Sequence, residues 1–331
     1  MNRRFPPPHA VRDLALGEDP LDETIAVPFE CGDNAGDVSG VDAKPDDGGH
    51  PIMILPRADG SFEWRDTAFG PALACPQVET VAAHLFTTRP WTLGRQGSQD
   101  VAWRDIAAAF GMPDSALVRM KQVHGRAVVI ADDHQWQLGS PLPEADIVLA
   151  SEPGNVIAVQ AADCVPMLVA DRRLGVVSAA HAGWRGLALG VPGAAVKAMA
   201  ETYGSRSEDL AVAIGPSVGA CCYEVGPDVM AAFEAGGFGG DQRRRWFHDR
   251  PPVVAGNPPM AGLRSEGRPG HAFFDGWQAA IDQLLASGVP QANIFCAHLC
   301  TASHPEVLCS YRRDGIAAGR IAGAITPARR R

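Results

Sequence analysis

From about residue 60 onward, the chain alternates short apolar runs with segments of helical pattern, and this alternation constrains the fold most strongly. Short apolar runs bounded by turn residues are typical of buried strands, whereas longer periodic segments are typical of helices. The predicted strands are residues 155–159, 165–170, 175–180, 210–214 and 293–301, with two short runs inside 116–130. The predicted helices are residues 100–111, 192–203, 228–235 and 275–285. Because these elements follow no strict βαβ order, we predict one α/β domain with mixed β-sheets.

Residues 236–270 are expected to form a long loop. The segment is rich in Pro, Gly and Arg and contains Arg243, Arg244 and Arg245 in a row. Long loops inside compact domains are typically lids or segments without fixed structure.

The acidic charge of the chain is concentrated near its start. The formal net charge is −9 over 331 residues, yet the first 50 residues hold eleven acidic and four basic side chains, which is a net −7. This stretch is rich in Pro, Gly and Asp and has too few aromatic residues to bury much apolar area. We therefore predict a flexible acidic extension over residues 1–60 and one catalytic domain over residues 61–331.

Composition excludes several classes of protein. Hydrophobic residues make up 46% and charged residues 20% of the chain, as in globular proteins. The acidic balance disfavours partners such as nucleic acid or an anionic membrane surface, and the apolar runs fall short of the ~20 residues needed to span a bilayer. The N-terminal arginines have no apolar core behind them, which argues against a signal peptide. With eight cysteines and no secretion signal, we expect a reducing, cytoplasmic location.

The segment 162–186 is predicted to be a β-hairpin that carries chemistry. Two apolar runs flank a polar turn at residues 171–174, and a register that pairs Ala170 with Gly175 also pairs Cys164 with His181. Cross-strand partners have Cβ atoms about 4.5–5.5 Å apart, which suits a shared metal ion or a Cys–His nucleophilic pair. The alternative is that both are ordinary core residues of a buried sheet.

His124 offers a third ligand. It lies in the polar sequence KQVHG, between two apolar runs. A set of two histidines and one cysteine resembles the three protein ligands of a catalytic zinc ion, whose fourth position stays open. On its own, His124 is equally compatible with a surface or core histidine.

Two other groups of cysteines bear on metal binding. Cys296, His298 and Cys300 would share one face of a strand, with His304 and Cys309 nearby, although a sheet face of small residues explains them as well. The adjacent Cys221 and Cys222 do not have the spacing of a usual zinc site, and we predict a structural role for them.

Six sequence motifs identify the family that the chain resembles. They occur in the order FTTR (86–89), KQVHG (121–125), AADC (161–164), HAGWRG (181–186), IGPSVGACCYEVG (214–226) and SYRRDG…GR (310–320). Together they resemble the YfiH-like family, also called laccase-domain or polyphenol-oxidoreductase proteins, over residues 76–325. The chain departs from the family pattern at PWTLGRQG (90–97) and FFDGWQAA (273–280), which bear on pocket shape.

The resemblance implies a fold, an activity and a ligand set. The implied fold is a single α/β domain with mixed β-sheets sandwiched between helices. The implied activity is that of a zinc-dependent purine nucleoside phosphorylase with adenosine deaminase activity, with a purine nucleoside and inorganic phosphate as small-molecule partners. The implied zinc ligands are His124, Cys164 and His181, and copper is a possible substitute for zinc because it binds more strongly to most N/S sites.

The same motifs supply candidate substrate contacts. Arg89, together with Cys164 and His181, is predicted to be catalytic. The predicted substrate- and phosphate-binding residues are Arg89, Gln122, Arg185, Arg312 and Arg313. Arginine offers a fixed fork for phosphate, although exposed arginines are often only solvated. Asp146 and Asp163 are candidates for orienting a ligand histidine or binding ribose.

Three other functions stay open from the sequence. The older family name implies copper-dependent oxidation of phenols, but one His/Cys/His set lacks the further ligands that a multicopper oxidase needs. A metal-free Cys164 beside His181 would suit a cysteine hydrolase, including a role in editing peptidoglycan precursors. A zinc ion that only stabilises the fold would require a closed site with four ligands.

Overall fold

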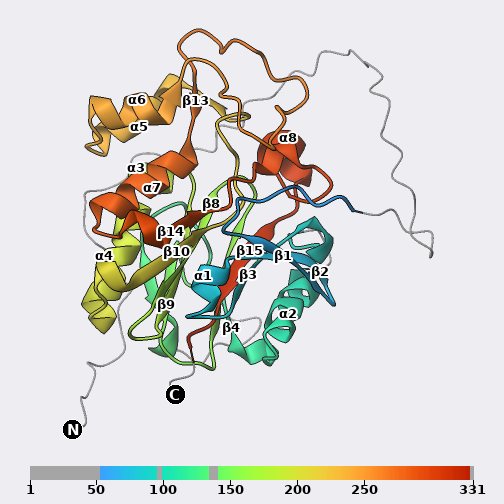
Figure 1. Cartoon of the computed structure of the whole chain (residues 1–331), viewed down its shortest axis with the longest axis vertical. Helices are drawn as coiled ribbons and strands as arrows, with labels where there is room; N and C mark the ends of the chain where they lie inside the picture. The colour runs from blue at the N-terminus through green and yellow to red at the C-terminus, as the bar shows by residue number, and fades with distance from the viewer. Residues whose placement is uncertain (1–52, 95–98, 134–140, 329–331) are drawn as a thin grey trace.

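The computed structural model describes residues 53–94, 99–133 and 141–328, and these residues form four stacked layers (Figure 1). Two six-stranded sheets pack face to face. Helices that include α4 (Val191–Tyr203) and α7 (Gly276–Ala286) cover the outer face of one sheet, and α2 (Gln99–Ala109) covers the outer face of the other. The structure confirms the predicted α/β fold with mixed sheets sandwiched between helices.

The first sheet has the strand order β14-β10-β8-β9-β6-β5. Its inner strands run antiparallel, while the pairs β10–β14 and β5–β6 are parallel. The strands are β5 (Val128–Ile130), β6 (Ile147–Ala150), β8 (Val165–Asp171), β9 (Val177–Ala182), β10 (Leu210–Ile214) and β14 (Ile294–Cys296).

The second sheet has the order β1-β2-β3-β15-β7-β4, with only β4 and β7 parallel. Its strands are β1 (Glu63–Thr67), β2 (Gly70–Ala74), β3 (His84–Thr87), β4 (Leu117–Val118), β7 (Val156–Ala161) and β15 (Ile321–Ile325). A small third sheet joins β11 (Glu224–Val225), β13 (Ala272–Phe274) and β12 (Phe247–His248). The remaining described α-helices are α1 (Pro76–Glu79), α3 (Trp184–Ala188), α5 (Pro227–Ala235), α6 (Gly240–Trp246) and α8 (Tyr311–Asp314).

Strand β8 shows how one apolar run serves two cores. All seven of its residues are buried. Val165, Met167 and Val169 pack toward the helices, whereas Leu168 and Ala170 pack into the core between the sheets. Because successive strand residues face opposite sides, a strand buried on both faces is a continuous apolar run, as β8 is up to its last residue, Asp171.

Local signals set the ends of two central helices. Helix α4 has Pro192 in its first turn and ends at Gly204, whose φ of 72° belongs to the left-handed region that favours glycine. Helix α7 begins after Asp275, whose carboxylate accepts the backbone N–H of Gln278 at 2.9 Å. Both helices therefore form where the sequence predicts them.

The β8–β9 hairpin forms with a register two residues away from the predicted one. Ala170 pairs with Val177 rather than with Gly175. The chain turns over residues 172–175, and the Gly175 N–H donates to the Asp171 carbonyl at 2.8 Å. Gly175 has a φ of 71°, so it completes the turn instead of starting the second strand. The turn therefore starts one residue later and ends one residue later than predicted.

Two other predicted elements are corrected by the structure. Residues 236–270 are not one continuous loop, because α6 places Arg243, Arg244 and Arg245 on a helix that continues into β12. The strand predicted for residues 293–301 ends at Cys296, and His298 has a φ of 46°. The period-two face proposed for Cys296, His298 and Cys300 therefore does not exist.

The predicted N-terminal extension falls mostly outside the described residues, because residues 1–52 are not among them. Within its last part, Leu55 and Ala58 pack against the core between the sheets, and the Asp59 N–H donates to the Ala297 carbonyl at 3.3 Å. Among the described helices, none is long and apolar enough to cross a bilayer.

Candidate functional site

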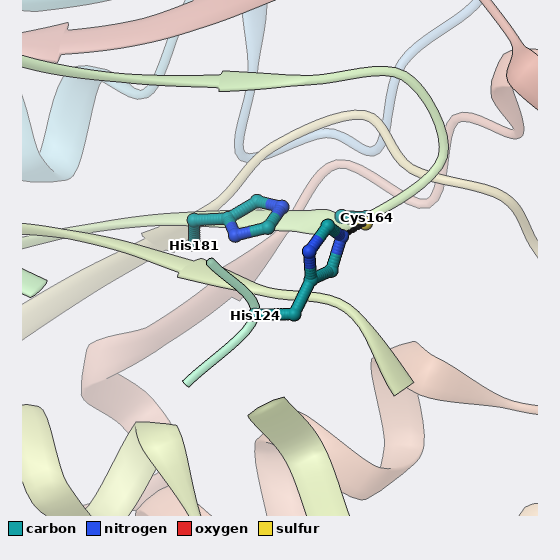
Figure 2. Close-up of side chains that lie close together, drawn as sticks. All are labelled: His124, Cys164 and His181. Carbon is teal, nitrogen blue, oxygen red and sulfur yellow. Dashed lines mark hydrogen bonds between the residues drawn. The ribbon is translucent and has the colours of Figure 1, made fainter. Parts of the chain in front are cut away.

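His124, Cys164 and His181 converge at one end of the layer between the two sheets (Figure 2). One ligand atom from each residue lies within 4.8 Å of the others. His124 Nε2 is 3.8 Å from Cys164 Sγ, and the two imidazole rings meet edge to face with centroids 4.9 Å apart. His124 is exposed, Cys164 is partly exposed and His181 is buried, so the group opens to solvent on one side.

Asp146 organises the loop that presents His124. Its buried carboxylate accepts three consecutive backbone N–H groups, from Val123 at 3.2 Å, His124 at 3.1 Å and Gly125 at 2.7 Å. His124 adopts a left-handed backbone with φ of 61°, which costs energy for a residue other than glycine. The loop therefore wraps around one carboxyl group, whose three hydrogen bonds hold this backbone conformation.

The same carboxylate orients His181. His181 Nδ1 lies 2.8 Å from Asp146 Oδ1, and the His181 backbone N–H donates to the Asp146 carbonyl at 2.8 Å. This pairing directs Nδ1 away from the group and leaves Nε2 for a ligand, as in carboxylate–histidine–metal arrangements. This contact is the one expected of a residue that orients a ligand histidine, as the sequence suggested for Asp146.

Cys164 lies in the bend between β7 and β8. It follows Asp163, whose φ of 92° is also in the left-handed region. Asp163 accepts a hydrogen bond from the Thr301 hydroxyl at 2.6 Å and one from the Arg312 N–H at 2.5 Å. These contacts tie the bend to two segments that are distant in the sequence, which fixes where the thiol points.

Cys164 and His181 shift each other's pKa. Burial alone would raise the pKa of the Cys164 thiol, but the His181 charge and hydrogen bonds from both histidines lower it to about 6. Burial would lower the pKa of His181, but Cys164 and Asp146 raise it to about 9. The thiolate, which is the metal-binding form of cysteine, is therefore favoured at neutral pH.

The donor set and the space around it fit a zinc ion. Two imidazole nitrogens and one thiolate match a catalytic zinc site with a fourth position open. Gly183 makes room for it, since a Cβ there would lie 2.8 Å from His124 Cδ2 and 3.0 Å from Cys164 Sγ. Only glycine leaves the ligand atoms free to converge.

The convergence survives the change in hairpin register. Continuing the observed register by one position places Cys164 opposite Gly183, with His181 on the diagonal. A shift of two residues leaves every side chain on its original face, whereas a shift of one would separate the two. The structure thus brings the three predicted ligands together, and their binding of a metal stays a prediction.

Two of the predicted arginines lie close to Asp314, at the end of α8, and donate to backbone carbonyls of residues 301–308. Arg313 pairs with Asp314 at 2.7 Å and donates to the carbonyls of Thr301 and Leu308 at 2.8 and 3.0 Å. Arg89 donates to the Pro305 carbonyl at 2.6 Å and lies 3.7 Å from Asp314. These contacts engage both guanidinium groups with residues 301–314.

Gln122 is fully engaged with the neighbouring strand. Its amide nitrogen donates to the Gln160 carbonyl, and its amide oxygen accepts the Gln160 N–H, both at 2.8 Å. This pair fastens the His124 loop to β7. The observed contacts of Gln122 are therefore those of a positioning residue.

Arg312 contacts Tyr223, which lies near Cys164. Its guanidinium carbon is 4.9 Å from the centre of the Tyr223 ring, and the side chain of Arg312 is exposed. Burial raises the pKa of Tyr223, and the nearby Cys164 and Asp163 raise it further, so the phenol stays neutral. Arg185 is also exposed and stacks over the adjacent Trp184 at 4.3 Å.

Sequence reasoning missed Tyr223 and Gly183 as parts of the site. Tyr223 lies in the motif IGPSVGACCYEVG, but its contact with Arg312 joins residues 89 positions apart. Gly183 lies in the motif HAGWRG, which does not show that its Cα faces His124 and Cys164. No local signal identifies either one, because each acts through neighbours from other segments.

A sequence profile supports the family resemblance. The profile of the family described as "Multi-copper polyphenol oxidoreductase laccase" matches residues 99–328. This range includes His124, Cys164 and His181.

Two relatives carry names that describe nucleoside chemistry. "Purine nucleoside phosphorylase" from Bacteroides thetaiotaomicron is 34% identical over 201 residues, covering 61% of this chain and 67% of the relative. "Adenosine deaminase RL5", from an unknown prokaryotic organism, is 32% identical over 220 residues, covering 65% of this chain and 76% of the relative.

A solved structure has the same fold. The crystal structure of the Bacillus licheniformis hypothetical protein YfiH superposes with a TM-score of 0.67, covering 80% of this chain and 99% of that one. The identity is 22%, so the likeness concerns the fold.

Proposed function

The chain belongs to the family described as multi-copper polyphenol oxidoreductase laccase, and from this premise we propose that it is a zinc-dependent purine nucleoside phosphorylase that also deaminates adenosine. The observation that carries the proposal is the convergence of His124, Cys164 and His181 beside the buried Asp146. The names of the two relatives supply the substrate class.

His124, Cys164 and His181 would hold the zinc ion. When bound, zinc supplies a Lewis acid and lowers the pKa of water at its open position. Asp146 keeps Nδ1 of His181 occupied and fixes the His124 loop, so both imidazoles stay oriented without substrate. The exposed side of the group, at His124, is where a nucleoside would enter.

Phosphorolysis needs an anion held near the ribose. A phosphate oxygen forms a bond to C1′, and the bond from C1′ to the purine nitrogen breaks, with its electron pair leaving on the purine. We assign the phosphate contact first to Arg312, because it is exposed and adjacent to Tyr223, whereas Arg89 and Arg313 are engaged with Asp314. Arg185, also exposed, is the next candidate.

Deamination of adenosine is a second activity of the same site. Water replaces the amino group at C6 of the purine, so the reaction needs no phosphate. The relative named adenosine deaminase supports this second activity. A single site would thus catalyse two reactions. The ratio of adenine to inosine formed would depend on the phosphate concentration.

Copper-dependent phenol oxidation, which the family description names, fits the ligands less well. Among the described residues, two groups could hold a metal, and only one of them contains histidine. A multicopper oxidase needs several copper ions to reduce oxygen, so this ligand inventory favours the nucleoside chemistry. A cysteine-hydrolase role for Cys164 would predict turnover that does not depend on metal.

The decisive experiment is incubation of the purified chain with adenosine, with and without phosphate, followed by identification of products. We expect adenine and ribose 1-phosphate with phosphate, and inosine in both conditions. Elemental analysis should give about one zinc per chain. Oxidation of a phenol without either nucleoside product would contradict the proposal.

We also propose that catalysis resides in residues 61–331, aided by the packed residues 53–60. Deleting residues 1–50 should leave nucleoside turnover and the melting temperature nearly unchanged. A large loss of either would show that the acidic segment contributes to the domain.

A further inference from the structure

A second group of sulfur ligands lies apart from the first. The Sγ atoms of Cys221, Cys222 and Cys300 all lie within 4.8 Å of one another, and all three side chains are buried. The three are free thiols. They come from two segments, the turn after β10 and the chain after β14, so the fold rather than the sequence spacing assembles them.

The backbone around this thiol cluster is held firmly. Ser217 and Cys300 form a bridge, in which the Ser217 N–H donates to the Leu299 carbonyl at 3.2 Å. The buried Asn257 accepts the Cys300 N–H at 2.7 Å and donates to the His298 carbonyl at 2.8 Å. The sulfur atoms therefore converge on a prearranged frame, which lowers the entropic cost of holding a ligand.

Two of the three sulfurs accept backbone hydrogen bonds. The Gly219 N–H donates to Cys300 Sγ at 3.3 Å, and the Met260 N–H donates to Cys222 Sγ at 3.2 Å. The Ser303 hydroxyl is 3.5 Å from Cys222 Sγ. Cysteines that serve only as small apolar core residues need no such donors, whereas thiolates bound to metals are commonly stabilised by them.

The number and type of donors select the ion. Structural zinc almost always takes four ligands, and no fourth His, Cys, Asp or Glu ligand atom in the described part of the chain joins the cluster. Thiolates select soft ions, among which closed-shell Cu(I) is stable with three sulfur ligands. We propose that Cys221, Cys222 and Cys300 form a second metal site, specific for a soft monovalent cation such as Cu(I).

Exposed residues cover the thiol cluster directly. The segment that covers Cys222 contains Pro258 and Pro259, both exposed, and its Met260 N–H is one of the donors to the cluster. We expect an ion to reach the thiols past this short segment. Thr301, next to Cys300, donates to Asp163 beside Cys164, so the two sites share one connecting segment.

The test uses the full chain loaded with one equivalent of zinc, titrated without oxygen with Cu(I) bicinchoninate. We expect the wild type to take one equivalent of Cu(I) from the chelator and to retain its zinc. Cys222→Ala and Cys300→Ala should each bind Cu(I) about 100-fold or more weakly, since losing a ligand exceeds the 10–100-fold typical of outer-shell changes. Cys296→Ala, which removes a buried thiol outside the cluster, is the matched control and should behave as wild type.

Two further measurements keep the proposal falsifiable if an alanine variant misfolds. Cys164→Ala, which disrupts the first site, should still bind one Cu(I). X-ray absorption of the copper-loaded wild type should show sulfur neighbours only. Histidine scattering at copper, stoichiometric loss of zinc, or equal Cu(I) uptake by folded Cys300→Ala and wild type would overturn the proposal.

Discussion

The two ligand groups of this protein have the same number of donors but opposite surroundings. His124, Cys164 and His181 come from three segments and open to solvent at His124, with the carboxylate of Asp146 behind them. The thiol cluster is buried, with no carboxylate in the group and backbone N–H donors around it. From this difference we expect access and neighbouring residues, rather than the number of ligands, to decide whether a site admits a substrate or only an ion.

We call the group of His124, Cys164 and His181 the open site. The largest expected effect is the loss of zinc from this site when its thiol is removed. Cys164→Ala removes one of three zinc ligands, so we expect purified protein with no zinc above background and neither phosphorolysis nor deamination. Elemental analysis and product chromatography measure both. Cys296→Ala, a buried thiol outside both groups, should keep zinc and turnover. Full zinc content in Cys164→Ala would contradict the assignment of Cys164 as a zinc ligand.

A second test concerns the space between the ligands. In Gly183→Ala the new Cβ would overlap His124 and Cys164, so a ligand must shift and zinc affinity should fall about 100-fold, as misplacement by about 1 Å can cost in activity. In Gly125→Ala the nearest atom, Asp146 Oδ2, is at an ordinary 3.6 Å. Competition with a zinc chelator should therefore show weaker zinc binding in Gly183→Ala than in Gly125→Ala. Equal affinities in the two variants would show that Gly183 does not border the metal.

A third test asks which arginine contacts phosphate. Arg312→Ala removes a charge-assisted hydrogen bond worth about 1.5–3 kcal/mol, which corresponds to about a 10- to 150-fold loss of phosphorolytic kcat/KM. Deamination should fall much less, so the product ratio shifts. Arg313→Ala instead breaks contacts with Thr301 and Leu308, and both activities should fall in parallel. A shifted ratio in Arg313→Ala alone would move the phosphate contact to that residue.

The carboxylate behind the open site gives a fourth test. Asp146→Asn weakens the acceptor for His181 and the His124 loop, so zinc affinity should fall about 10- to 100-fold. Asp132→Asn is the matched control, because Asp132 likewise accepts the N–H groups of Ser151 and Glu152 but away from the ligands. Both variants should lose stability, and only Asp146→Asn should lose zinc. Unchanged zinc affinity in Asp146→Asn would contradict its orienting role.

The smallest expected effect is on the stability of the protein and tests the burial of His84 in β3. Burial, and to a lesser extent Arg65, lowers the pKa of His84 to about 4. The unfolded chain takes up this proton near pH 6.5 and the folded chain does not, so the free energy of unfolding falls as pH drops from 6.5 toward 4. The contribution of His84 between pH 7.5 and 5 is about 2 kcal/mol.

Urea unfolding at the two pH values measures this contribution. His84→Gln should remove about 2 kcal/mol of the pH dependence that the wild type shows between pH 7.5 and 5. An identical pH dependence in wild type and His84→Gln would show that the imidazole is charged in the folded protein.

The sequence by itself determined most of the central strands and helices and one face of the open site. Apolar runs such as residues 165–170 and 210–214 predicted buried strands, and Gly204 and Asp275 predicted helix ends, because these signals act within a few residues. Even with a register two residues off, strand periodicity kept Cys164 and His181 on the same face. The three ligands were thus within reach of sequence reasoning.

Tertiary structure decided what lies around those ligands. Asp146 binds the His124 loop across 20 or more positions, Thr301 reaches Asp163, and Cys300 joins Cys221 and Cys222 only after β10 and β14 pair. The sequence misassigned Cys300 to a strand face because His298 turns the chain with a positive φ. Local patterns set the face and ends of an element, but contacts between distant segments depend on how the layers pack, and no short-range signal encodes that packing.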